Sequence, residues 1–124
     1  MRKLSIDVVL SIHKEVLIDS GGQDGILDKN LLDSALFSPY QTFGGEDLYP
    51  TIFDKAARLA FGIIRNHPFV DGNKRTGATA MHILLEANGY TLGFSQEELI
   101  EIILSVADGR AGYEELSAWI RSHI

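Results

Sequence analysis

Apolar residues recur along this chain at helical spacing, and the alternation typical of strands is almost absent. From Ser5, a residue type that often caps helices, they follow at i, i+3, i+4 and i+7 until Gly21-Gly22. A short helix is expected from Asp28 to Phe37. Between Thr51 and Asn66, apolar residues cover more than half of the helix circumference, which is typical of a helix packed on several sides.

The second half of the chain repeats this pattern. A helix is predicted from Asn73, as its N-cap, to Gly89, and Ser95 with Glu98 forms the capping box of the next helix. A last helix is expected after Gly112. The pattern therefore predicts an all-α fold, a compact bundle of about six helices in a single domain over residues 1–124.

One segment, Tyr40 to Pro50, departs from the helical pattern. Its Gly44-Gly45 pair lies between Thr42-Phe43 and Leu48-Tyr49, so it can turn a small β-hairpin. An ordinary surface loop explains the same residues equally well.

Polar residues on two of the predicted helices have a structural explanation. Lys55, Arg58 and Arg65 share one side of the central helix, and a charged stripe of this kind is usually the solvated face. His13 lies on the apolar side of the first helix, where a packed or hydrogen-bonded histidine is expected. We therefore assign a structural role to the charged stripe and to His13.

Composition narrows the function classes. The formal net charge of −6 argues against general nucleic-acid binding, for which a basic face is expected. The chain has no cysteine, which excludes a disulfide framework and a thiolate zinc site. No apolar run approaches membrane-spanning length and no signal-peptide core follows the N-terminus, so a cytoplasmic protein is expected.

Candidate chemistry concentrates in the ten residues from His67 to Thr76, HPFVDGNKRT. Pro68 disfavours the α region for His67, so the preceding helix is expected to end there and His67 to be extended. An imidazole, whose ordinary pKa is about 6.5, suits a general base that takes a proton from a hydroxyl. Phe69 is expected to anchor the loop in the core.

The second half of this stretch has the features of a phosphate site. Gly72 and Asn73 tolerate positive φ, and the backbone N–H groups of such a turn can converge on an anion. The helix N-terminus and the cations of Lys74 and Arg75 would favour the same anion. Asp71 is a hard oxygen ligand that can hold Mg²⁺ against the phosphates.

The string HPFVDGNKRT resembles the signature of the Fic/Doc superfamily, and with Lys74 it is similar to the death-on-curing (Doc) toxin branch. The segments Gly25 to Leu36, Leu48 to Asn66 and Leu85 to Tyr90 also look like Doc sequences. Fic adenylyltransferases usually have a glycine at the position of Lys74 and an arginine where this chain has Ala78. Doc-type proteins are protein kinases that phosphorylate a threonine of elongation factor Tu and so stop translation.

This resemblance implies a Fic-like helical bundle and a role for each residue of the signature. His67 would be the general base and Asp71 the Mg²⁺ ligand. Four residues would form the phosphate cradle for ATP, the last two of them also catalytic: Gly72, Asn73, Lys74 and Arg75.

The resemblance also implies partners. In Fic/Doc proteins a flap at the place of Tyr40 to Pro50 docks the target segment by adding a strand, so Phe43, Leu48 and Tyr49 would help to choose the substrate. Toxins of this family are usually held by a Phd-type antitoxin whose helix lies across the active-site cleft. A Phd-like antitoxin in trans is therefore expected.

Three functions are consistent with these observations. The leading hypothesis is a Doc-like kinase that transfers the γ-phosphate of ATP to a Thr or Ser hydroxyl of a protein, elongation factor Tu being the expected target. The second keeps the same residues but transfers a nucleotide, as a Fic-type nucleotidyltransferase does; Lys74 and Ala78 argue against it. The third is a weakly active module that binds an antitoxin, and the intact signature favours an active enzyme.

Overall fold

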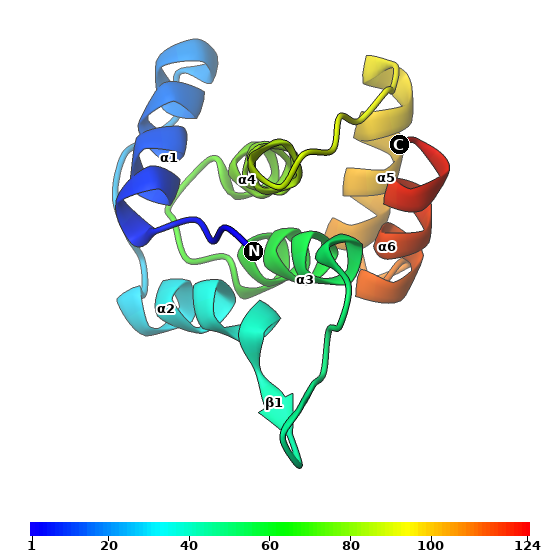
Figure 1. The fold of residues 1–124 in the computed structure, drawn as a ribbon. Helices are drawn as coiled ribbons and strands as arrows, with labels where there is room; N and C mark the ends of the chain where they lie inside the picture. The colour runs from blue at the N-terminus through cyan, green and yellow to red at the C-terminus, as the bar shows by residue number, and fades with distance from the viewer.

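The helices α3 (Ile52–Asn66) and α4 (Asn73–Ala87) lie at the centre of the computed structural model, which describes residues 1–124. Helices α1 (Ile6–Ser20) and α2 (Lys29–Phe37) flank this pair on one side (Figure 1). Figure 1 also shows α5 and α6 together on the other side. The predicted all-α fold is confirmed, with these bounds for the remaining elements: η1 Ser38–Tyr40, β1 Thr42–Phe43, β2 Glu46–Asp47, α5 Gln96–Ala107 and α6 Tyr113–Ser122.

Two glycines let the central helices approach their neighbours. A Cβ atom at Gly77 on α4 would lie 2.8 Å from Cγ1 of Ile64 on α3, which is closer than real side chains pack. A Cβ atom at Gly62 would lie 3.1 Å from the Cα and Cβ atoms of Ala35 on α2. The close crossing of α3 with α4 matters for function because the loop that joins them carries the candidate site.

Three helices begin at the capping residues that the sequence predicts, and α4 ends at the predicted glycine. Ser5, Asp28 and Ser95 each accept a hydrogen bond from the first turn of their helix, and Ser95 forms the full capping box with Glu98. Gly89 follows α4 with a φ of 90°, the left-handed conformation expected of a residue that ends a helix.

The predicted hairpin exists, but its second strand is not Leu48-Tyr49. Strand β1 pairs with Glu46–Asp47, with Phe43 opposite Glu46. The reason is the turn: Gly44 and Gly45 both have positive φ, 60° and 83°, so they form a two-residue connection that pairs the residues directly flanking them. Leu48 follows the strand and donates its N–H to Gln41 O at 3.0 Å.

The expectation of a solvated charged stripe on α3 is wrong at Lys55. This side chain is 3% exposed, and its ammonium group donates to the Tyr49 carbonyl and to Oδ2 of Asp47 at 3.1 Å. Arg58 is half-buried, with Nε 3.1 Å from the Tyr49 hydroxyl, and Arg65 alone of the three is exposed. The hairpin covers this side of α3, which a pattern read along one helix cannot show.

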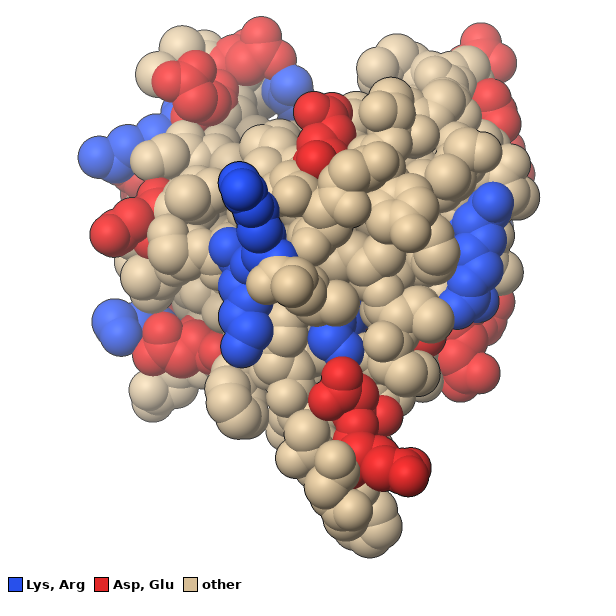
Figure 2. All heavy atoms as spheres, in the orientation of Figure 1, with Lys and Arg blue, Asp and Glu red and all other residues tan.

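The surface is mixed in charge and hollowed on one side. Figure 2 shows the hairpin projecting from the body, with acidic side chains gathered along it, and a hollow between α1 and α5 over α4. None of the helices combines the length and the apolar character that a membrane crossing requires.

Candidate active site

Helix α3 ends at Asn66, as predicted, but His67 is not extended. Its φ of 54° and ψ of 55° place it in the left-handed region, and it is the only residue other than glycine with a positive φ. In this conformation the His67 N–H closes the helix by donating to Ile63 O at 3.3 Å. This helix-capping bond outweighs the preference for extended backbone before proline, and it leaves the His67 side chain exposed.

The loop after His67 is held by the segment that precedes α2. Leu27 N–H donates to Pro68 O at 2.7 Å, and Val70 N–H donates to Gly25 O at 3.0 Å. Phe69 lies between these bonds with its side chain completely buried, which confirms it as the anchor of the loop. The loop therefore has a fixed conformation although its polar side chains face solvent.

Asn73 is the first residue of α4, and Gly72, with a φ of 85°, takes the N-cap position that we expected for Asn73. The buried Asn73 side chain points back into the loop instead. Its Oδ1 accepts the Phe69 N–H at 3.0 Å, and its Nδ2 lies 2.9 Å from Phe69 O and 3.0 Å from Nδ1 of His67. One amide thus links the start of α4 to the imidazole at the end of α3.

The N-terminus of α4 is open to an anion. The first hydrogen bond of the helix runs from Thr76 N–H to Gly72 O at 2.9 Å, and no side chain caps the turn. The N–H groups of residues 73 to 75 therefore have no acceptor within the helix. N–H groups of this kind, together with the helix dipole, can bind a phosphate or a carboxylate.

The two cations at this end of α4 differ in their surroundings. Both are exposed, but Arg75 Nη2 is paired with Oδ2 of Asp19 on α1 at 2.6 Å, whereas Lys74 has no ion-pair partner. Lys74 is the cation that is free to contact an anion without breaking an existing bond.

Asp71 is exposed immediately before this helix end, and one of its carboxylate oxygens is already engaged. Oδ2 accepts the backbone N–H of Gln23 at 2.8 Å, which leaves Oδ1 for a ligand. The structure contains no group of three or more acidic or histidine side chains that could hold a metal ion by themselves. The residues present fit Mg²⁺ of the kind bound by one carboxylate together with phosphate oxygens and water.

His13 is buried and hydrogen-bonded, as the sequence predicts, but its partner belongs to the candidate site. Its Nε2 lies 2.8 Å from the backbone O of Asp71. The backbone of Gln23 makes a second contact to Asp71, which the sequence does not indicate because a backbone donor carries no side-chain signal. For the contact between His13 and the Asp71 carbonyl, the only indication in the sequence is the position of His13 on the inward side of α1.

The hairpin lies toward the other end of α3 from His67. Lys55, in the first turn of the helix, holds the hairpin base, and at 1.5 Å per residue His67 lies about 18 Å further along the axis. Phe43 is 80% exposed and Leu48 is about half exposed, while Tyr49 is bound to Arg58 and to Lys55. Phe43 and Leu48 are therefore the free apolar side chains of this segment.

A groove of about 680 Å³ begins at the N-terminal end of α4, beside Lys74 and Arg75, and runs between α4 and α5. On the other side of α4, toward α1, a second depression has an acidic lining that includes Asp7, Glu15 and Asp19. Both are lined by Arg75, Thr79 and Ile83, so they meet over α4 in the hollow of Figure 2. The apolar side chains of the groove include Leu92, Phe94, Leu99, Ile100, Ile103 and Leu104.

Fold and site together define a class of protein: a small helical domain in which one loop between two central helices presents an imidazole, a carboxylate and an open helix N-terminus. The family model described as the Fic/DOC family matches residues 3–85, which include all of these features. The chain belongs to the Fic/DOC family.

Two relatives extend this comparison to the toxin branch of the family. The chain is 37% identical over 100 residues to Toxin Doc of Mycolicibacterium smegmatis, an alignment that covers 79% of this chain and 77% of the relative. It is 23% identical over 121 residues to Protein kinase doc of Escherichia phage P1, which covers 98% of this chain and 94% of that protein. The resemblance inferred from the sequence is confirmed.

Proposed function

We propose that this protein is a Doc-like toxin kinase that acts in the cytoplasm and transfers the γ-phosphate of ATP to a Thr or Ser hydroxyl of a protein, with elongation factor Tu as the expected target. The observation that carries the proposal is the position of three groups on one rigid loop. His67, the Asp71 carboxylate and the open N-terminus of α4 lie within nine residues of chain, held by Asn73 and the Gly25–Asp28 segment.

In this reaction the target oxygen forms a bond to the γ-phosphorus as the bond to the bridging β–γ oxygen breaks, and the hydroxyl proton passes to His67. Lys74, Arg75 and the N–H groups of the first turn of α4 bind the phosphates and compensate their charge. Asp71 would hold Mg²⁺, which when bound neutralises phosphate charge and orients the phosphates. Positioning and charge neutralisation carry most of the catalysis.

Target recognition would combine the hairpin with the loop. An extended segment spans about 3.3 Å per residue, so the roughly 18 Å between the anchored hairpin base and His67 corresponds to about five or six residues. A target strand paired with β1 or β2 could contact Phe43 and Leu48 and still deliver a hydroxyl to His67.

An antitoxin in trans is part of the proposal. The hollow over α4 has an apolar wall on α5 and an acidic wall on α1, and it reaches Lys74 and Arg75. These walls fit an amphipathic helix whose apolar side faces α5 and whose basic side faces α1. A helix seated there would cover the phosphate-binding end of α4.

Intact mass spectrometry tests the function directly. Purified elongation factor Tu is incubated with ATP, Mg²⁺ and either this protein or its His67→Ala variant. A gain of one phosphate, about 80 Da, that is absent with the variant supports the kinase and the general base together, because loss of such a base reduces the rate roughly 10²–10⁴-fold. A gain of AMP instead would support nucleotidyl transfer, and no gain with either protein contradicts the proposed target.

A further inference from the structure

A side chain outside the signature loop touches that loop at two points. The ring of His13, on α1, stacks on Phe69 with a centroid distance of 3.8 Å and an interplanar angle of 10°. The same ring reaches the backbone O of Asp71 through Nε2 at 2.8 Å. His13 is 2% exposed, so this contact is excluded from water.

The chemistry of the two atoms fixes the direction of this hydrogen bond. A backbone carbonyl only accepts, so Nε2 of His13 carries the hydrogen and donates it to Asp71. The ring has little room to move, because one face is stacked on Phe69 and the side chain is buried. The donor is therefore held rigidly against the peptide group of Asp71.

The carboxylate of Asp71 is also held by the α1 side of the molecule, through the turn that follows this helix. Helix α1 ends at Ser20 with Gly21 as its C-cap, and two residues after Gly21 the N–H of Gln23 donates to Oδ2 of Asp71 at 2.8 Å. Gly22 permits this approach, since a Cβ atom there would lie 2.9 Å from Cβ of Asp71. Helix α1 and the turn that follows it thus fix both the backbone and the carboxylate orientation of one residue.

We propose that His13 is a positioning residue for Asp71 and acts together with the backbone N–H of Gln23: through their hydrogen bonds to the Asp71 carbonyl and to Oδ2, the two groups hold the free carboxylate oxygen in the orientation that binds a divalent cation together with nucleotide phosphates. This inference rests on the proposed function, in which Asp71 binds Mg²⁺. Groups that orient a ligand without touching the metal typically change metal affinity by about 10–100-fold when they are removed. A histidine that only filled the core would change stability and leave cation affinity unchanged.

The test uses Mn²⁺ as a probe for the divalent cation, with its binding to the purified protein in the presence of ADP followed by electron paramagnetic resonance. His13→Phe keeps an aromatic ring on Phe69 but removes the donor, and we expect it to weaken Mn²⁺ binding by about tenfold. His13→Gln restores an N–H donor at a similar reach and should bind within about threefold of the wild type. His82→Phe, on α4, is the matched control and should not change the affinity.

Gly22→Ala provides an independent variant if His13→Phe does not fold. The added methyl group displaces the Gly22–Gln23 turn from Asp71 while the stack of His13 on Phe69 is kept, so Mn²⁺ binding should again weaken. A folded His13→Phe or Gly22→Ala variant with wild-type affinity overturns the inference but leaves the proposed function intact. Wild-type protein that binds no Mn²⁺ with ADP contradicts the assignment of Asp71 and overturns the inference with it.

Discussion

The side-chain amide of Asn73 lies 3.0 Å from Nδ1 of His67 and determines which nitrogen of that ring carries a hydrogen. The orientation of the amide is fixed, because its oxygen accepts the Phe69 N–H and its nitrogen donates to Phe69 O. An N–H therefore faces Nδ1, and a neutral His67 carries its own hydrogen on Nε2. A proton can be accepted at Nε2 only after the hydrogen moves to Nδ1, which removes the bond to Asn73.

This arrangement predicts the tautomer of the free protein. Nitrogen-15 chemical shifts and couplings of the imidazole should show that the neutral form of His67 carries its hydrogen on Nε2. Binding of nucleotide with Mg²⁺ should raise the fraction with hydrogen on Nδ1 if Nε2 is the base. A ring that is already protonated on Nδ1 in the free protein would contradict the contact with Asn73.

Removing the amide should destabilise the whole loop. Asn73→Ala leaves the N–H and C=O of Phe69, both buried, without partners, and we expect a loss of roughly 2–4 kcal/mol in the free energy of unfolding. Urea denaturation measures this loss. Asn30→Ala, at an exposed position on α2, is the control and should stay within about 0.5 kcal/mol of the wild type. Equal stabilities of the two variants would show that the Asn73 network contributes little.

Lys74 should determine which phosphate is transferred. Lys74 is the cation at the start of α4 that has no ion-pair partner. Lys74→Gly removes this cation and introduces the glycine that Fic adenylyltransferases usually have. We expect γ-phosphoryl transfer to fall at least tenfold or AMP transfer to rise, because transition-state charge would lose a partner. Mass spectrometry of the target separates the two products. Unchanged transfer of both groups would remove Lys74 from the mechanism.

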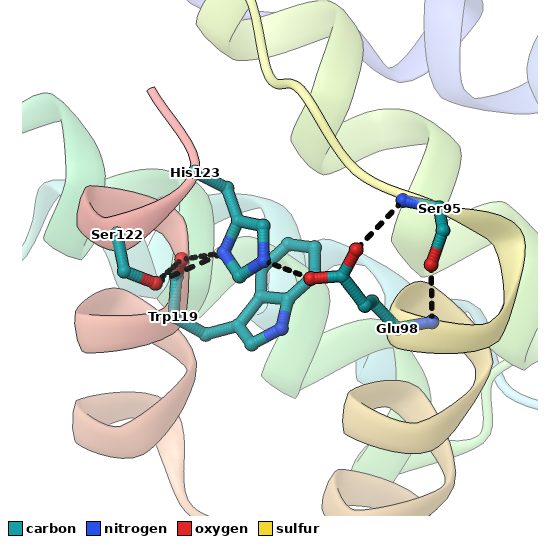
Figure 3. Close-up of polar contacts among 5 residues, drawn as sticks. All are labelled: Ser95, Glu98, Trp119, Ser122 and His123. Atoms are coloured by element: carbon teal, nitrogen blue, oxygen red, sulfur yellow. Dashed lines mark hydrogen bonds and ion pairs between the residues drawn. The ribbon is translucent and has the colours of Figure 1, made fainter.

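The contact between α5 and α6 should depend on pH. Both ring nitrogens of His123 face acceptors, Oε2 of Glu98 at 2.7 Å and Trp119 O at 2.7 Å, so the charged ring is favoured (Figure 3). The hydrogen bond between His123 and Glu98 raises the pKa of His123. The same bond is the main cause that lowers the pKa of Glu98 to about 2. The Ser95 N–H donates to the same carboxylate, as Figure 3 shows.

The sign of the pH effect follows from these shifts. The raised pKa of His123 adds stability that is complete below about pH 6.5 and is lost as the pH rises through the folded-state value. The lowered pKa of Glu98 adds stability above about pH 4.5 that is lost as the pH falls toward 2. The difference in Tm between wild type and His123→Gln should therefore be largest between these limits and shrink as the pH rises through the raised pKa of His123. A difference that does not vary with pH would contradict a charged pair.

Lys55 should control the hairpin more than the core. Lys55→Met keeps the buried aliphatic chain but removes the donor to Asp47 and to the Tyr49 carbonyl. We expect faster proteolysis and hydrogen exchange in residues 41–50, with a smaller change in global unfolding, because the hairpin is exposed and can open locally. Lys29→Met removes an exposed pair with Asp33 and should affect neither measurement. Hairpin exchange at the wild-type rate would show that Lys55 is not the anchor.

The helices could be predicted from the sequence because their signals are local. Ser5, Asp28 and the Ser95–Glu98 box define helix starts within a few residues of chain, and the structure has helices that begin at each. The position of the candidate site on the loop from His67 to Asn73 was also predictable, since no other stretch combines these side chains.

The features that were mispredicted or missed depend on contacts between distant segments. The conformation of His67 is the exception, since it depends on a local helix-capping bond to Ile63 that competes with the proline rule. Lys55 is buried because a hairpin from another segment covers it, and His13 reaches Asp71 across 58 positions of sequence. Patterns within one helix do not contain this information.

The left-handed backbone of His67 implies a conflict between stability and activity. Non-glycine residues in this region are destabilised by about 1 kcal/mol or more relative to glycine, so His67→Gly is expected to relax the backbone while it removes the imidazole. Selection for stability alone would therefore favour replacing the residue that we propose as the base. Variants evolved only for thermal tolerance should therefore change this position early and lose activity when they do.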